Sequence, residues 1–405
     1  AKTPSVWRKR IPKLVAALLA LCLLSVVCII ANNLRPGLGP FGGQGTAQAM
    51  LTETLAGDAQ TSATWDLGML SDPVDTPAVN PETPGAAAGT QTAPTRRPTS
   101  LPPESANRLV ERHSWDNPEK PFLAALWPNN QTLGMVSTNM IRLMRISDGA
   151  RMLTIQNPSS ASIQSAIFSP DHRMIACGFD DGKIRLWDYS NNTLLATLNG
   201  HSQGVTSLAF FSNGNYLASG AADGSAILWN TQDLLAGKRP SQLYQTQISS
   251  AAVNALVIAA NANGVITGSA DGSLHTWVAP QDQLQTTSAG QGAAILSLAL
   301  ATNEKQLAIS NASGQVYLWQ STNDKNISLE GNSGAVRSLV FSPDGSLLAG
   351  GDAKGRVIIW QTANGKLVAM LEGHGGAVIS VAFSLDGLLL VSAAEDGSIK
   401  VWGAP

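Results

Sequence analysis

The stretch Asp396-Gly397-Ser398-Ile399-Lys400-Val401-Trp402 decides the fold, because its order of turn, alternating strand and tryptophan recurs along the chain. Polar and apolar residues alternate with period 2 before the tryptophan, which predicts a half-buried strand rather than a helix. Five earlier tryptophans close similar stretches: Trp187, Trp229, Trp277, Trp319 and Trp360. Successive positions differ by 42, 48, 42, 41 and 42 residues. A period near 40 residues indicates a repeat architecture.

An Asp-Gly pair precedes four of these strands, at residues 181–182, 223–224, 271–272 and 396–397. Asp-Gly between two alternating strands is typical of a two-residue hairpin, in which both turn residues have positive φ. The sequence therefore predicts antiparallel hairpins that end in the tryptophan strands.

The composition excludes several classes of protein. The 405 residues carry a net charge of −2, and the folded part lacks the basic face expected of a nucleic-acid-binding protein. The cysteines are Cys22, Cys28 and Cys177, and their positions support neither a disulfide framework nor a metal site. Cys177 falls in a predicted strand, where we expect a small buried apolar residue.

The N-terminal region predicts a membrane anchor. Residues 14–31 contain no charge and no proline, and 18 residues of helix span about 27 Å, close to the thickness of a bilayer core. Basic residues gather before this segment, so we expect a cytoplasmic N-terminus at residues 1–13 and a single transmembrane helix at 14–31. The folded part would then lie on the extracytoplasmic side, periplasmic or cell-surface. A cleaved signal peptide and the inverted topology are the alternatives.

Residues 32–104 are rich in Pro, Thr, Ala and Gly, which predicts a low-complexity linker. One interpretation is an extended spacer that holds the following domain away from the bilayer. The other is a strap that becomes ordered on a partner, for which Trp65 and the apolar residues after it are the only evident anchors.

Residues 105–405 divide into seven units, each expected to form four strands. The first unit is degraded and has Met144 at the tryptophan position, 43 residues before Trp187. The last unit has only three strands of its own, and the segment 108–113 forms a predicted strand without a unit. We expect that segment to complete the last unit and to close the ring, which leaves only short protected edges.

The units from about residue 105 onward resemble the WD40-repeat β-propeller family. Two units carry the same four residues at the same offsets: His201, Ser219, Asp223 and Trp229, and His374, Ser392, Asp396 and Trp402. The resemblance implies that each quartet is a structural relay in which Asp binds His, His binds Ser, and Ser binds the indole N–H. The other four tryptophan-bearing units lack the histidine, so there we expect packing alone to hold the blade.

The resemblance implies an all-β fold, a seven-bladed propeller preceded by the transmembrane helix and linker. No histidine stands at metal-ligand spacing, and no local motif of nucleophilic or phosphate chemistry occurs. We therefore expect no catalytic residue, no metal and no cofactor. The alternative is a propeller enzyme or small-ligand sensor that acts at the central channel.

Partners of such propellers often bind the face that carries the Asp-Gly turns. The residues on that face that the fold does not require are candidate partner contacts: Phe179, Asp180, Asn311, Asp352, Lys354 and Glu395, with Trp65 in the linker. The function expected from sequence is a membrane-tethered protein-interaction scaffold, an accessory subunit of a membrane protein assembly that binds other proteins and no nucleic acid.

Overall fold

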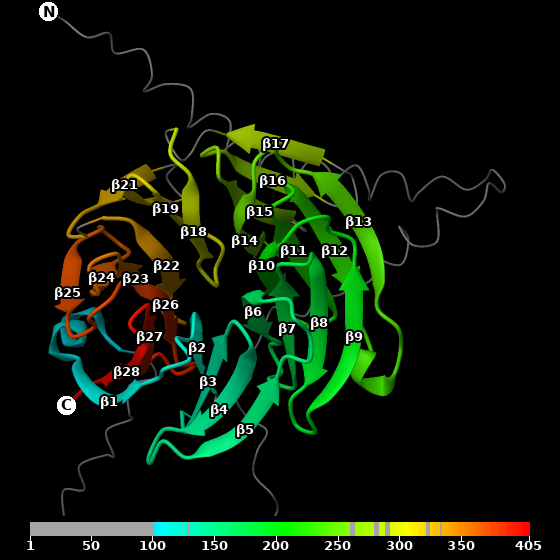
Figure 1. Cartoon of the computed structure of the whole chain (residues 1–405). Coiled ribbons are helices and arrows are strands. Elements are labelled where there is room, and N and C mark those ends of the chain that lie inside the picture. The colour runs from blue at the N-terminus through cyan, green and yellow to red at the C-terminus, as the bar shows by residue number, and fades with distance from the viewer. Residues whose placement is uncertain are drawn as a thin grey trace, which may run out of the picture.

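Seven four-stranded antiparallel sheets form a ring (Figure 1). The computed structural model describes residues 101–405 except 128–129, 260–263, 279–282, 288–291, 321–324 and 333. In each sheet, here called a blade, the first strand lies nearest the centre of the ring and the fourth lies at its circumference (Figure 1). The predicted seven-bladed propeller is therefore confirmed.

The first four blades each use four consecutive strands. Blade 1 contains β2 (Leu123–Leu126), β3 (Thr132–Ser137), β4 (Met140–Arg145) and β5 (Arg151–Gln156). Blade 2 contains β6 (Ile163–Phe168), β7 (Met174–Phe179), β8 (Lys183–Asp188) and β9 (Thr193–Asn199). Blade 3 contains β10 (Val205–Phe210), β11 (Tyr216–Ala221), β12 (Ser225–Asn230) and β13 (Ser241–Gln247). Blade 4 contains β14 (Val253–Ala259), β15 (Gly264–Ser269), β16 (Leu274–Val278) and β17 (Gln283–Thr287).

The remaining strands form three blades. Blade 5 contains β18 (Ile295–Leu300), β19 (Gln306–Asn311), β20 (Val316–Gln320) and β21 (Lys325–Leu329). Blade 6 contains β22 (Val336–Phe341), β23 (Leu347–Asp352), β24 (Val357–Gln361) and β25 (Leu367–Leu371). Blade 7 contains β26 (Val378–Phe383), β27 (Leu389–Ala394), β28 (Ser398–Gly403) and, from the start of the domain, β1 (Val110–Asp116).

Strand β1 closes the ring by pairing antiparallel with β28, from Val110 opposite Gly403 to Asp116 opposite Ser398. An ion pair joins the same two strands, since Lys400 Nζ lies 2.7 Å from Glu111 Oε2. The predicted closure is confirmed. Its boundaries differ from those expected, because residues 103–108 form the 3-10 helix η2 (Pro103–Arg108) and only the residues from Val110 onward pair.

The folded domain begins earlier than residue 105, so the predicted linker boundary at 104 requires correction. Leu101 is 4% exposed and Ala106 is fully buried, and both pack in an apolar cluster with Leu371 of β25 and Trp402 of β28. The proline-rich composition of this segment concealed its few apolar anchors. The part of the predicted linker before residue 101 lies outside the described residues.

The core lies at the seams between blades. Within the described residues, each of seven apolar clusters draws its side chains from two neighbouring blades. Polar contacts follow the same seams near the centre, where a serine hydroxyl of one blade accepts a backbone N–H of the next. Ser297 Oγ accepts Leu339 N–H at 3.0 Å, and Ser338 Oγ accepts Val381 N–H at 3.1 Å. Ser380 Oγ accepts Ala124 N–H at 3.3 Å, which continues this pattern from the last blade to the first.

At three of the four Asp-Gly turns, three residues separate the strands rather than the two predicted. Strand β7 ends at Phe179 and β8 begins at Lys183, and of the three intervening residues only Gly182 has positive φ, at 78°. This matches a type I turn followed by one left-handed residue. The aspartate supports the loop locally, because Asp181 Oδ1 accepts the backbone N–H of Lys183 at 3.1 Å.

Candidate interaction surfaces

The predicted relay residues of blade 3 lie together in the interior of the blade. Trp229 Nε1 donates to Ser219 Oγ at 2.9 Å, and Ser219 Oγ lies 2.7 Å from His201 Nε2. Ser219 is fully buried and His201 is 8% exposed. The other ring nitrogen, His201 Nδ1, lies 2.8 Å from Ser225 Oγ, which in turn donates to Asp223 Oδ1 at 2.7 Å.

Blade 7 repeats this chain of contacts. Trp402 Nε1 donates to Ser392 Oγ at 2.8 Å, and Ser392 Oγ lies 2.6 Å from His374 Nε2. His374 Nδ1 lies 2.5 Å from Ser398 Oγ, which donates to Asp396 Oδ1 at 2.6 Å. In blades 3 and 7 the same polar chain therefore ties the second and third strands to the connection that precedes the first strand.

The relay has five members rather than the four expected, because a serine lies between the aspartate and the histidine. Asp223 Oδ1 is 3.6 Å from His201 Nδ1, beyond hydrogen-bond distance, whereas Ser225 bridges them. The sequence did carry a signal for the missing member, since Asp-Gly is followed by Ser at both residues 225 and 398.

The donors along the relay assign the protonation state of the histidine. Because Trp229 donates to Ser219 and Ser225 donates to Asp223, one arrangement gives every contact a single hydrogen: Ser219 donates to His201 Nε2, and His201 Nδ1–H donates to Ser225. The imidazole is therefore neutral. Burial lowers the pKa of His201 and lowers the pKa of His374 to about 4, in agreement with a neutral ring.

The stability of the domain is expected to fall on acidification through pH 6.5. His374 titrates near 6.5 in an unfolded chain and near 4 in the folded one, so between these values the unfolded state binds the extra proton. Stability from the neutral ring is therefore complete above pH 6.5 and is lost progressively toward pH 4. Between pH 4 and 6.5 the thermal unfolding midpoint of the variant His374→Gln should depend less steeply on pH than that of the parent chain. The difference in slope should correspond to about one proton taken up on unfolding.

A specific result of this experiment would contradict the neutral state of the relay histidine. Asp223, whose burial raises its pKa, accepts hydrogen bonds from Ser225 and Ser202 that together lower its pKa to about 2. Its contribution is lost only below pH 4, so it does not act in the window used. Equal pH slopes for the parent chain and the variant between pH 4.5 and 6.5 would mean that the relay histidine is already charged.

Blades without the relay histidine fill the equivalent space in other ways, and three predicted partner contacts are part of these arrangements. Phe179, Asn311 and Asp352 each end the second strand of a blade, and all three are fully buried. They cannot present their side chains to a partner, so their prediction as surface contacts is corrected. The sequence placed them beside a turn but did not show that the neighbouring strand covers them.

Each of the three has a distinct local partner. The Arg185 guanidinium lies over the Phe179 ring, 4.1 Å from its centroid. Asn311 Nδ2 donates to Gln315 Oε1 at 3.0 Å. Asp352 Oδ2 lies 2.6 Å from Arg356 Nη2, and its other oxygen accepts the backbone N–H of Lys354. The expectation that packing alone holds these blades is therefore corrected as well.

The other predicted contacts on the Asp-Gly face are exposed: Asp180, Lys354 and Glu395. Asp180 Oδ1 accepts the backbone N–H of Ser162 at 3.0 Å, and Glu395 pairs with Arg337 of the neighbouring blade. These two side chains thus have contacts within the domain and also face solvent. Trp65, the remaining candidate, lies outside the described residues.

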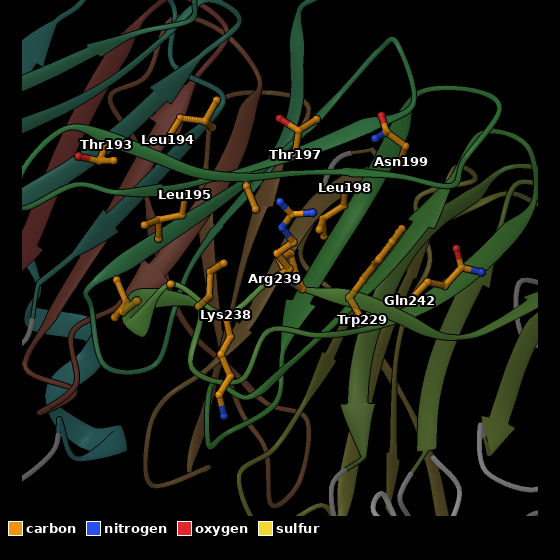
Figure 2. A pocket seen from close by; sticks show the side chains of 15 residues that line it. Thr193, Leu194, Leu195, Thr197, Leu198, Asn199, Trp229, Lys238, Arg239 and Gln242 are labelled. Carbon is orange, nitrogen blue, oxygen red and sulfur yellow. The ribbon is translucent and has the colours of Figure 1, made fainter. Parts of the chain in front are cut away.

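A groove of about 710 Å³ opens at the circumference between blades 2 and 3 (Figure 2). Strand β9 forms one wall from Thr193 to Asn199, and Trp229 and Gln242 of blade 3 lie on the other side. The connection between β12 and β13, which contains the 3-10 helix η3 (Leu234–Ala236), contributes the rest of the lining. This connection accounts for the 48-residue step in the tryptophan period.

The relay geometry and the ring agree with sequence comparisons. The family profile described as "WD domain, G-beta repeat" matches residues 150–188, 192–230 and 365–403. These segments contain Trp187, Trp229 and Trp402, at the ends of blades 2, 3 and 7. The profile "Anaphase-promoting complex subunit 4 WD40 domain" matches residues 298–375. The described domain is a WD40-repeat β-propeller.

Curated relatives share parts of this WD40 propeller. Topless-related protein 1 of Arabidopsis thaliana is 30% identical over 138 residues, which are 33% of this chain and 12% of the relative. Centriole proteome protein 16 of Chlamydomonas reinhardtii is 37% identical over 67 residues, 16% of this chain and 3% of the relative. WD repeat and HMG-box DNA-binding protein 1 of Xenopus laevis is 31% identical over 115 residues, which are 28% of this chain and 10% of the relative. The chain spans about an eighth or less of the length of these relatives.

Two further findings concern the described part of the WD40 propeller. It contains no group of three or more His, Cys, Asp or Glu side chains placed to hold a metal ion. Nor does any helix among these residues have the length and apolar character needed to cross a membrane. The transmembrane span predicted at residues 14–31 lies outside the described residues.

Proposed function

We propose that this chain is a protein-interaction scaffold that a helix at residues 14–31 tethers to a membrane, as an accessory subunit of a membrane protein assembly. The observation that supports binding is the closed ring of seven blades, which holds exposed turns and rim grooves in fixed positions. Preorganised surfaces lose little entropy when a partner binds. The relay histidines, which could otherwise be candidates for acid–base chemistry, have both ring nitrogens occupied within their blades.

The tether is proposed from sequence. Residues 14–31 are uncharged and follow the basic residues Arg8, Lys9, Arg10 and Lys13, a pattern that favours a cytoplasmic N-terminus. The propeller would then be extracytoplasmic. Protease treatment of sealed, right-side-out vesicles tests this topology: we expect the propeller to be accessible to protease, whereas protection until the vesicles are opened would reverse the orientation.

Binding to other proteins is tested by purification of the full chain from native membranes in mild detergent, after chemical cross-linking in the intact membrane. We expect one or more membrane proteins to co-purify in a fixed ratio, with cross-links to propeller residues. Isolation of the chain alone, both with and without cross-linking, would contradict the scaffold function.

The alternative of an enzyme or ligand sensor at the central channel gains no support from the described residues. Both grooves with described linings lie between outer parts of neighbouring blades, at blades 2 and 3 and at blades 5 and 6. The first of them is lined by apolar side chains together with Lys238 and Arg239.

A further inference from the structure

The groove between blades 2 and 3 has a counterpart between blades 6 and 7, at an offset of 173 residues. Adding 173 to Trp229 gives Trp402, and adding it to Leu198 gives Leu371. Leu195 corresponds in the same way to Val368, and each is partly buried against the apolar cluster of its own seam. The two seams are therefore built from matched side chains on matched strands.

The counterpart is occupied by a short segment of the chain itself. Residues 101–109 lie along β25 ahead of β1, where the cyan coil contacts the orange strand in Figure 1. Leu101, Ala106 and Leu109 are 4%, 0% and 8% exposed, and they share one apolar cluster with Leu371 and Trp402. A nine-residue segment with three apolar anchors thus fits this type of seam.

The seam between blades 2 and 3 is only partly covered. The connection between β12 and β13 places Leu234, 4% exposed, against the apolar cluster that contains Leu198 and Trp229. Leu195 and Leu235 remain partly buried, and the groove of about 710 Å³ lies beside them. Apolar surface left open in this way is typical of an interaction site.

The charge of the groove indicates which charge a partner should carry. Two adjacent cations, Lys238 and Arg239, line it. Lys238 Nζ lies 2.6 Å from Asp233 Oδ2, and this pair neutralises the lysine. Among the described residues Arg239 has no carboxylate within ion-pair distance, and its side chain is exposed. Figure 2 shows the Arg239 side chain directed toward β9, while Lys238 extends the opposite way.

We propose that this groove binds a short extended segment of a partner protein that carries aliphatic anchors and one carboxylate. The aliphatic side chains would cover Leu195 and Leu235, as Leu101 and Leu109 cover the counterpart, and the carboxylate would accept hydrogen bonds from the Arg239 guanidinium. The outer edge of β9, which pairs only with β8, offers unpaired backbone groups to an added strand. This inference rests on the proposed scaffold function and assigns one site to it.

The test uses phage-displayed random 12-residue peptides selected on the full chain in mild detergent, followed by fluorescence polarisation with the selected synthetic peptides. We expect enrichment of aliphatic residues together with Asp or Glu. Arg239→Glu should weaken binding at least tenfold, and Leu195→Ser roughly fivefold. Lys366→Glu, in the groove between blades 5 and 6, is the matched control and should leave the affinity unchanged. Equal melting temperatures of the four proteins exclude a folding defect.

The inference would be overturned if the selected peptides were basic or if their affinities were indifferent to Arg239→Glu. It would also be overturned if a synthetic peptide of residues 63–72 bound the groove more tightly than any selected peptide. The last would mean that the groove serves the chain's own segment around Trp65. Sedimentation of the full chain as an Arg239-dependent dimer would likewise assign the groove to a second copy. Failure of peptide binding while membrane proteins still co-purify rejects the groove alone, whereas absence of co-purifying proteins rejects the scaffold function.

Discussion

Replacement of Val110–Asp116 by a Gly/Ser segment of equal length is expected to open the ring and to lower the melting temperature by roughly 5–10 °C. Six registered residue pairs join β1 to β28, and ladder hydrogen bonds contribute about 1 kcal/mol each. A loss of about 5 kcal/mol in a domain of this size corresponds to a shift of this order. The ion pair between Lys400 and Glu111 would be lost together with the ladder.

Hydrogen exchange localises the effect of this replacement. Backbone amides of β28 should exchange much faster than those of β24, the equivalent strand of blade 6, because β28 becomes an edge strand. Val110→Ser is the control, since Val110 is 42% exposed and its loss should change the melting temperature by less than about 1 °C. If β28 retained the protection of β24 after the replacement, β1 would not be the strand that closes the ring.

Arg356→Met is expected to destabilise the domain by about 3–5 kcal/mol, because it leaves the carboxylate of Asp352 buried without its counter-charge. The Asp352 side chain is fully buried, and two nitrogens of Arg356 contact its Oδ2, Nε at 3.0 Å and Nη2 at 2.6 Å. Backbone N–H groups of Lys354 and Arg356 reach the other oxygen. The carboxylate therefore organises the whole turn between β23 and β24.

A double-mutant cycle measures this pair. Asp352→Asn combined with Arg356→Met should recover a large part of the loss, since the neutral amide still accepts the backbone N–H groups without a buried charge. Lys238→Met is the matched control for an ion pair at the surface: it removes the 2.6 Å contact with Asp233 but should cost less than about 1 kcal/mol. Chemical denaturation provides the free energies. Equal losses for Arg356→Met and Lys238→Met would show that burial does not govern the pair.

The tryptophan period and the unpaired strand before the first blade were sufficient to predict the ring and its closure. The tryptophan period and the alternation of polar and apolar residues both arise from packing between blades. Because every blade packs in the same way, the pattern recurs along the chain. The start of the domain was not predictable in the same way, because Leu101 and Ala106 stand alone in a proline-rich segment. Their burial depends on β25, which lies more than 250 residues later.

The polar interior was predicted only in blades 3 and 7, which carry the same residues at the same offsets. The quartets of blades 3 and 7 were visible as repeated offsets, but the serine between aspartate and histidine resembles any turn serine. In blades 2, 5 and 6 the buried position holds Phe179, Asn311 and Asp352, three side chains of different chemistry. Each contacts a residue four to six positions later, on the next strand or just before it, so no common pattern marks it. Asn311 and Asp352 lie beside turns and were therefore predicted to be exposed, whereas the structure buries them.

The closing strand also sets an order for synthesis. Glu111 and Lys400, which pair across the closure, are 289 residues apart in sequence. At a translation rate of about 5–20 residues per second, β1 leaves the ribosome roughly 15–60 s before the strand that it pairs with. During this interval its backbone groups lack their final partner and blades 1 to 6 can already stack. We expect a nascent propeller of this kind to depend on holding chaperones until its last strand emerges.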